Sequence, residues 1–335
     1  MGCKARLVLH DGRTGQRLPR APRRNPQNAR MPTLPRPIVR PLRALATLAL
    51  LCAALLPLPG CGTAPPGNGP ALLLLGEVHD NAAQHALRLQ RAQALLAGGA
   101  RPALLMEQFD RERQADINRL LQAVPAMDSG GAERDGPVDA LVQLGRQDSA
   151  GWDWPLYRPY LHLALQYRLP IVAANVSRTD ARLVMQQGLA ARGFDATVPA
   201  DIQAAQAGAI QQSHCGQVDA VLAGRMALAQ VARDQFMARS ISAHAGRGVL
   251  LLAGNGHVRK DVGVPRWLPP GLQARSLAVG YLEAGDASAA AFDAVVFTAA
   301  QPRNNPCAGM PAVATDGSSA ASPSSPPATT SRARP

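Results

Sequence analysis

Short apolar runs along the chain alternate with longer stretches in which apolar residues recur every three or four positions. The four runs occupy 71–75, 103–106, 170–174 and 248–253. Runs of four to six residues rich in Leu, Val, Ile and Ala are typical of strands buried on both faces. The helical patterns lie at 85–97, 114–122, 156–167, 178–188 and 218–243. This alternation predicts an α/β fold with a mostly parallel sheet flanked by helices.

Two features extend this scheme. Residues 276–281 and 292–298 have the composition of strands and lie close together in the sequence, so we expect an antiparallel pair at one edge of the sheet. The helical stretches at 111–165 and 178–245 are longer than a simple crossover needs. We therefore expect a helical lid subdomain over one end of the sheet.

The polar residues that follow the four apolar runs carry the candidate chemistry. They are Glu77 and His79, Glu107, Asn175, and His257. In parallel α/β sheets, ligands bind outside the carboxyl ends of the strands, so these side chains are expected at one pocket. An isolated polar residue after a strand is usually a solvated loop residue, but four coincident cases indicate a site.

Metal binding is one chemistry that these residues suit. Two His and two Glu are ligand types for a divalent metal such as zinc or manganese. The candidate ligands are His79, His85, Glu107 and His257. Glu77 or Glu107 could instead act as general base on a metal-bound water. The spacing does not match His-Glu-x-x-His, which excludes that type of zinc protease.

The turn before the first helix has its own signals. Asn81 is a candidate N-cap, and Gln84 stands three residues later, as in a capping box. Gly76 and Gly254 allow the backbone to turn sharply where a ligand approaches. For His257, a satisfied turn histidine is the alternative to a ligand.

The net charge of +12 and the pI near 10.6 first suggest a nucleic-acid-binding protein. However, residues 1–61 hold eleven basic residues against Asp11 alone, or +10. The remainder has 24 basic and 22 acidic residues, or +2. A nearly neutral body has no surface that follows phosphates, so we expect no nucleic-acid partner.

The basic head has the layout of a secretory signal. Arg40 and Arg43 precede the apolar run 44–58, which leads to Gly60 and Cys61. This end resembles a bacterial lipobox, which predicts lipidation of Cys61, although Pro59 departs from the usual small residue. An ordinary secretory signal that contains a Cys, or an uncleaved anchor, are the alternatives. We expect an outer membrane lipoprotein of the cell envelope. Its position on the periplasmic face or on the cell-surface face stays undecided at this point.

The domain boundaries follow from these segments. We expect residues 1–61 to comprise a spurious N-terminal extension, with translation starting at Met31, and the lipoprotein signal peptide. A Gly/Pro linker at 62–70 leads to the folded domain at 71–307. The Ser/Pro-rich tail at 308–335 is expected to be disordered.

Two cysteines fall in the folded domain, Cys215 and Cys307. In an exported protein, two remaining cysteines favour a disulfide. Two free thiols are the alternative.

Several separated motifs, in order, resemble the ChaN family of the Tiki superfamily over about 72–283. The motifs are Gly76-Glu77-Val78-His79-Asp80-Asn81 with His85, Glu107 with Phe109-Asp110-Arg111, Gly151-Trp152-Asp153-Trp154-Pro155-Leu156-Tyr157, Ala173-Ala174-Asn175, His214-Cys215, Asp234 with Met237-Ala238, and Gly254-Asn255-Gly256-His257-Val258. The resemblance implies an α/β fold with a helical subdomain and bacterial surface lipoproteins associated with haem binding and iron uptake. Related Tiki proteins are metal-dependent proteases with paired Gly-x-x-His motifs plus a Glu.

A haem needs an axial ligand, and the resemblance suggests a tyrosine. Tyr157 is the first candidate and Tyr160 the second, with core aromatics as the alternative. Arg259 with Lys260 could meet the haem propionates, or form a solvated loop. Gln230, Arg233 and Asp234 have helical spacing and could line the pocket from the lid. His162, His214 and His244 are expected to be ordinary surface or packing residues.

These observations predict an exported, lipid-anchored protein that resembles ChaN and binds haem for iron uptake. The rival is a metal-dependent hydrolase or peptidase of the Tiki type, so catalytic activity stays open. A third possibility is a binding protein for another small ligand. The expected partners are haem and a membrane, with a homodimer as one assembly.

Overall fold

The computed structural model describes residues 71–123, 135–148 and 151–308. The proposed signal, the lipidation site at Cys61, the linker and the tail beyond residue 308 lie outside the described residues. No helix among those described is long and apolar enough to cross a membrane.

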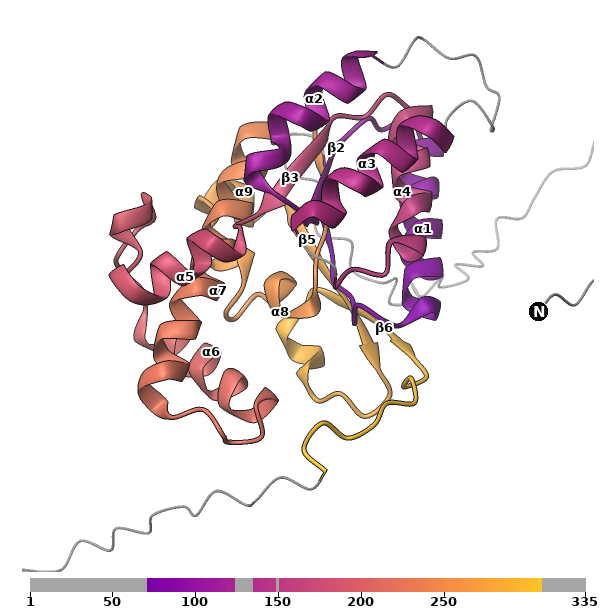
Figure 1. Cartoon of the computed structure of the whole chain (residues 1–335). Coiled ribbons are helices and arrows are strands. Elements are labelled where there is room, and N and C mark those ends of the chain that lie inside the picture. The colour runs from indigo at the N-terminus through magenta and orange to yellow at the C-terminus, as the bar shows by residue number, and fades with distance from the viewer. Residues whose placement is uncertain (1–70, 124–134, 149–150, 309–335) are drawn as a thin grey trace, which may run out of the picture. The chain divides into compact units, whose positions relative to one another are not determined.

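A single sheet forms the centre of the described fold (Figure 1). Its strands are β1 (Leu72–Leu75), β2 (Ala103–Asp110), β3 (Ile171–Asn175), β4 (Val249–Leu252), β5 (Ser276–Glu283) and β6 (Ala294–Thr298). They lie in the order β3-β2-β4-β1-β5-β6, and every neighbouring pair is parallel. The four central apolar runs and the parallel α/β fold are therefore confirmed.

Helices cover both faces of the sheet. They are α1 (Ala82–Ala97), α2 (Gln114–Ala123), α3 (Asp135–Asp148), α4 (Trp154–Gln166), α5 (Arg178–Gln187), α6 (Ala200–Ser213), α7 (Ala220–His244), α8 (Asn255–Val258) and α9 (Pro270–Gln273). Strand side chains alternate between the faces, so Leu73 and Leu75 pack with α1–α4, whereas Leu72 and Leu74 pack with the second half of α7. Both faces being buried explains why the strands lack polar alternation.

The last two strands correct one expectation, because β5 and β6 pair in parallel. Val279 pairs with Ala294 and Glu283 with Thr298. Between the strands the chain passes through a 3-10 turn at Ser288–Ala291, which carries it back beside the start of β5. Closeness in sequence suggested a hairpin, but this connection is long enough to return the chain and restart in the same direction.

The helical lid also needs correction in its first half. Ile117 of α2, Leu141 of α3 and Leu161 of α4 belong to the core against the sheet. Among the residues that the structure describes, the stretch from α5 to the first half of α7 is the one that forms a separate lobe, with its own small apolar clusters around Val184 and Ile210.

The C-terminal segment is tied to two parts of the fold. Cys307 forms a disulfide with Cys215, which lies in the connection between α6 and α7. Arg303 forms ion pairs with Asp80, at the start of α1, and with Glu283 of β5. The structure thus selects the disulfide over two free thiols.

Candidate ligand site at the carboxyl ends of the strands

The two Gly-x-x-His turns, Gly76–His79 (the first turn) and Gly254–His257 (the second turn), lie side by side because β1 and β4 are neighbours, with Leu75 opposite Leu252. The backbone N–H of Asn255 donates to the carbonyl of Glu77 at 2.9 Å, which fastens one turn to the other. Glu107 comes from β2, on the other side of β4. Strand order thus brings together residues that are up to 180 positions apart in the sequence.

The first glycine of each turn leaves room for the other turn. A Cβ at Gly76 would lie 2.2 Å from the Asn255 Oδ1 atom and 3.2 Å from its Cα. A Cβ at Gly254 would lie 2.9 Å from Cε1 of His79. Gly254 has an ordinary φ of −63°. Steric fit, rather than the sharp backbone turn expected from the sequence, therefore accounts for these glycines.

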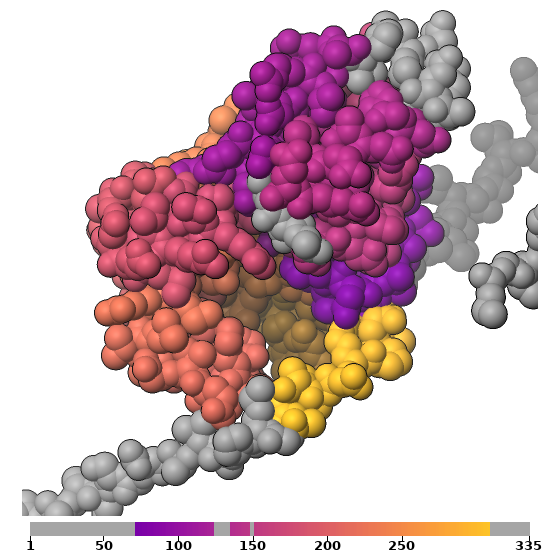
Figure 2. Space-filling model, viewed as in Figure 1, coloured from indigo at the N-terminus to yellow at the C-terminus, as the bar shows by residue number. Residues whose placement is uncertain are grey.

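A cavity of about 320 Å³ opens at this end of the sheet. Figure 2 shows the face hollowed between the α6–α7 pair and the C-terminal segment. The lining residues are His79, Glu107, Asp110, Trp152, Asn175, Val176, Arg178, Gln230, Arg233 and His257. Residues that follow β1, β2, β3 and β4 all contribute, so the polar strand ends do meet in one place. We call this space the polar cavity.

His79 lies at the polar cavity with 48% of its side chain exposed. Its Nδ1 atom is 2.9 Å from Oε1 of Glu77. A carboxylate only accepts, so Nδ1 donates in this contact, and the neutral tautomer with that proton has its lone pair on Nε2. Glu77 is fully buried, pairs with Arg88 and accepts a 2.5 Å hydrogen bond from the Tyr157 hydroxyl. Glu77 is thus occupied in holding His79 and is not free to act as a base.

His257 is held differently. Its Nδ1 lies 2.6 Å from Oδ1 of the fully buried Asp234, and its Nε2 lies 3.5 Å from Oε1 of Glu107. Burial lowers the pKa of His257, but the Glu107 and Asp234 carboxylates outweigh burial and raise it to about 10. The imidazole is therefore charged at neutral pH.

The two carboxylates around His257 are both ionised at neutral pH. Burial raises the pKa of Glu107, but the neighbouring His257 and the Gly254 N–H, which donates at 2.7 Å, bring it down to about 2. Burial raises the pKa of Asp234 to about 6, with His257 opposing the rise. Two carboxylates thus share one imidazolium beneath the polar cavity.

Two predicted haem ligands are buried away from the polar cavity. Tyr157 and Tyr160 are 0% and 1% exposed. The Tyr157 hydroxyl donates to Glu77, and the Tyr160 hydroxyl donates to the His85 carbonyl at 2.9 Å. Burial raises the pKa of both phenols, which disfavours the phenolate that iron binds. In this structure both tyrosines therefore pack as core aromatics, and iron ligation by either of them stays a prediction.

His85 and Arg259 also lie elsewhere than expected. His85 is buried behind the first turn, with Nε2 3.0 Å from the His79 carbonyl, and does not line the polar cavity. Arg259 forms an ion pair with Asp261 at the surface. Their positions follow from packing that spacing alone does not reveal: His85 lies against the Tyr157 ring, and Arg259 meets an acid two residues away.

Other expectations agree with the structure. Gln230 and Arg233 line the polar cavity from α7, and Asp234 holds His257. Asn81 caps α1, accepting from the Gln84 N–H at 3.2 Å. The Gln84 side chain reaches back to the Val78 N–H instead of the cap residue.

Sequence reasoning missed Arg88 and Arg178. Arg88 is fully buried on α1, one turn after His85, and an arginine on the inward side of a helix was the available signal. Arg178 is the first residue of α5, three positions after the end of β3, where the strand-end argument could have included it.

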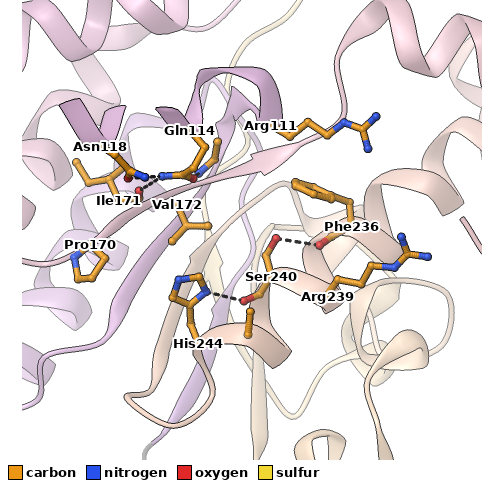
Figure 3. A pocket seen from close by; sticks show the side chains of 12 residues that line it. Arg111, Gln114, Asn118, Pro170, Ile171, Val172, Phe236, Arg239, Ser240 and His244 are labelled. Carbon is orange, nitrogen blue, oxygen red and sulfur yellow. Dashed lines mark hydrogen bonds between the residues drawn. The ribbon is translucent and has the colours of Figure 1, made fainter. Parts of the chain in front are cut away.

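A second hollow lies at the edge strand β3, between α2 and α7 (Figure 3). This edge groove of about 430 Å³ is mainly apolar. The Gln114 side chain bonds to the Ile171 carbonyl and the Ala173 N–H, at 3.0 and 2.8 Å. His244 bonds to the Ser240 carbonyl. The groove is larger but has no cluster of convergent titratable groups, so the polar cavity is the candidate site.

No set of three or more His, Cys, Asp or Glu side chains in the described part of the chain has the arrangement of a metal site. The site as folded is a pair of histidines whose Nδ1 atoms are held by buried carboxylates.

Fold and site define an α/β protein with a polar ligand cavity between neighbouring parallel strands. A family model described as haem-binding uptake, Tiki superfamily, ChaN matches residues 68–268. The chain belongs to this family. No curated protein sequence matches it.

One solved structure of a ChaN protein shows the same fold, and two others have weaker similarity. The structure described as cofacial heme binding to ChaN of Campylobacter jejuni has a TM-score of 0.51 and 18% identity, covering 64% of this chain and 82% of that one. The type III effector HopBA1 has a TM-score of 0.39 and 16% identity, with 72% and 99% covered. A mutant erythromycin esterase EreC, in its open conformation, has a TM-score of 0.35 and 14% identity, with 66% and 72% covered.

Proposed function

We propose that this protein is an exported lipoprotein that binds haem for iron uptake, with the haem in the polar cavity beside His79. Family membership supports the ligand class. The observation that carries the proposal is the state of His79: it is half exposed, its Nδ1 is held by Glu77, and its Nε2 is free of that bond. Histidines that bind a metal centre typically have such a carboxylate on the other ring nitrogen.

His79 and Trp152 are the residues at the polar cavity that support a haem. Bound haem would supply an iron that accepts a lone pair, and His79 offers one. Arg88 and Tyr157 fix the Glu77 carboxylate, which fixes the imidazole in turn. The Trp152 ring stands edge-on to His79, with centroids 4.8 Å apart, and adds an aromatic wall. A cavity of this size is near the lower end of ligand pockets, so the haem would remain partly exposed.

The cellular setting belongs to the same proposal. Lipidation at Cys61 would anchor the chain in the outer membrane, and the 62–70 linker would separate the domain from the lipid surface. The basic residues and the apolar run before Cys61 support this export route. Labelling with a fatty-acid analogue tests it, since Cys61→Ser would abolish incorporation.

Titration of the purified protein with haemin tests the ligand. We expect a shift of the Soret band that is lost or strongly altered in His79→Ala and retained in Tyr157→Phe. His214→Ala is the matched control, because this histidine lies in the α6–α7 connection outside the polar cavity. Loss of the shift in Tyr157→Phe alone would restore the tyrosine ligand. No shift in the wild type would remove the haem proposal.

A metal-dependent hydrolase is the second candidate, because His79 and Glu107 both approach Gly254 from the polar cavity. A Cβ there would lie 3.1 Å from His79 Nε2 and 3.7 Å from Glu107 Oε2. His257 would complete a set of ligands only after losing its proton. Glu107 would then serve either as a ligand or as the base. Metal analysis of the wild type, His79→Ala and His257→Ala distinguishes this candidate, which predicts bound zinc or manganese in the wild type only.

A further inference from the structure

The C-terminal segment at 299–308, which we call the strap, follows β6 and ties two parts of the fold together. At one end, Arg303 forms an ion pair with Asp80, at the end of the turn that precedes α1. At the other end, Cys307 forms the disulfide with Cys215, in the connection between α6 and α7. The strap therefore joins the entrance of α1 to the helical lobe.

The two parts that the strap joins both contribute to the polar cavity. Asp80 directly follows His79, which lines the cavity from the first turn. Gln230 and Arg233 line it from α7, the helix that begins after the connection with the disulfide. Figure 2 shows the α6–α7 pair on one side of the hollow and the C-terminal segment on the other. The disulfide is thus the covalent part of a bridge between two walls of the cavity.

The segments that the disulfide holds together have little apolar packing. At the tip of the α6–α7 pair (residues 210–227), Ile210, Ala223 and Ala227 form a small cluster that is separate from the core at the sheet. None of the described residues of the strap belongs to an apolar cluster, and residues 302–306 are exposed. Elements with few buried apolar contacts open locally at a low cost in free energy. We therefore expect the tip and the strap to separate when the disulfide is broken.

The disulfide also lies where a reductant can reach it. Cys215 and Cys307 are half-buried, and the residues on either side of each are exposed. Exposed disulfides are typically the labile or regulatory ones. A dithiol attacks one sulfur as a thiolate, which breaks the S–S bond and forms a mixed disulfide that the second thiol then resolves. Two electrons pass to the cysteines, which take up the two protons of the dithiol, and the dithiol leaves as a disulfide.

We propose that the Cys215–Cys307 disulfide is a redox-operated clasp on the polar cavity. While it is oxidised, it holds the tip against the strap and so keeps the first half of α7 close to the first turn. Reduction by a dithiol releases the tip and makes the polar cavity more accessible. The clasp acts on access to the cavity, so it does not depend on the haem function proposed above.

Hydrogen exchange with dithiothreitol as the dithiol tests the clasp. The full-length wild type is compared with Cys215→Ser/Cys307→Ser, each with and without dithiothreitol, and mass spectrometry follows exchange in the tip, the strap and the strands β1–β4. Labelling with iodoacetamide verifies that the link is reduced. The double Ser variant keeps Cys3, Cys52 and Cys61, so it controls for effects of dithiothreitol elsewhere in the chain.

Fluorescence of Trp152 reports access to the polar cavity, which this residue lines. Quenching by acrylamide is measured for the wild type and for Trp152→Phe, before and after reduction. The difference between the two proteins isolates the emission of Trp152 from that of Trp154 and Trp267.

We expect dithiothreitol to speed exchange in the tip and the strap of the wild type by about tenfold or more and to leave β1–β4 unchanged. The double Ser variant should exchange fast in both segments under either condition, and quenching of Trp152 should rise on reduction. A link that stays oxidised in the folded protein, unchanged exchange in the tip, or an equal rise in β1–β4 would overturn the clasp. Unchanged quenching of Trp152 despite faster exchange in the tip would overturn its effect on the cavity.

Discussion

The two Gly-x-x-His turns have the same sequence pattern and different chemistry. In both, the histidine Nδ1 meets a fully buried carboxylate, Glu77 for His79 and Asp234 for His257. The second ring nitrogens differ. Nε2 of His257 faces Glu107 and the side chain is 12% exposed, whereas His79 is half exposed at the cavity. The first turn presents a ring nitrogen to the cavity, and the second holds its imidazole between two carboxylates.

The difference comes from where the carboxylates originate. Glu77 lies inside its own turn and is paired with Arg88. Asp234 comes from α7, and Glu107 adds a second charge from β2. A motif therefore supplies an imidazole, but the charges packed around it decide whether the imidazole can bind a ligand.

The largest effect is expected for Glu77→Gln. This change leaves Arg88 as a buried charge without its partner, which typically costs about 3–5 kcal/mol of unfolding free energy. Urea unfolding measures the loss. Glu112→Gln is the control, because this half-exposed residue pairs with Arg111 at the surface and should change stability by less than about 1 kcal/mol. Similar small losses in both variants would show that the first turn does not depend on this ion pair.

Removal of the disulfide should have the next largest effect. Cys215 and Cys307 are separated by 92 residues, and breaking a link that closes such a loop costs about 2–4 kcal/mol. The link also joins the segment that contacts the first turn to the α6–α7 connection, which leads into the helix that carries Asp234. Urea unfolding of the wild type and the double Ala variant, each without and with reductant, measures the loss. Reductant should destabilise the wild type alone, so an equal reductant effect in the variant would contradict this origin.

Asp234→Asn should cost less than Glu77→Gln, about 1.5–3 kcal/mol, the usual value of a hydrogen bond to a charged group. His257 keeps Glu107 as a counter-charge, so no buried charge is left alone. The same unfolding series compares the two turns directly. A larger loss for Asp234→Asn than for Glu77→Gln would reverse the proposed ranking.

The sequence predicts the strands and the strand-end residues because burial on both faces demands apolar runs, and parallel strands end on one side. It does not predict which side chains form hydrogen bonds or ion pairs with one another. The motif around Tyr157 suggested a ligand, yet its hydroxyl donates a hydrogen bond to Glu77, which is 80 residues away in the sequence. The direction of β6, the Cys215–Cys307 link and the inward position of Arg88 likewise depend on contacts distant in sequence.

The smallest effect is expected in the pH dependence of stability that Glu283 contributes beside the first turn. The hydrogen bond from Arg303 lowers the pKa of Glu283 from 4.5 to about 2, against burial, and Asn81 also donates to this carboxylate. Because the pKa is lower in the folded state, Glu283 stabilises the fold above pH 4.5 and loses this contribution as pH falls towards 2. We expect about 0.2–1 kcal/mol, since Arg303 is partly exposed. Unfolding midpoints measured from pH 6 to pH 2 should fall more steeply in the wild type than in Glu283→Gln. Parallel profiles would mean that the C-terminal segment does not stabilise the first turn through this carboxylate.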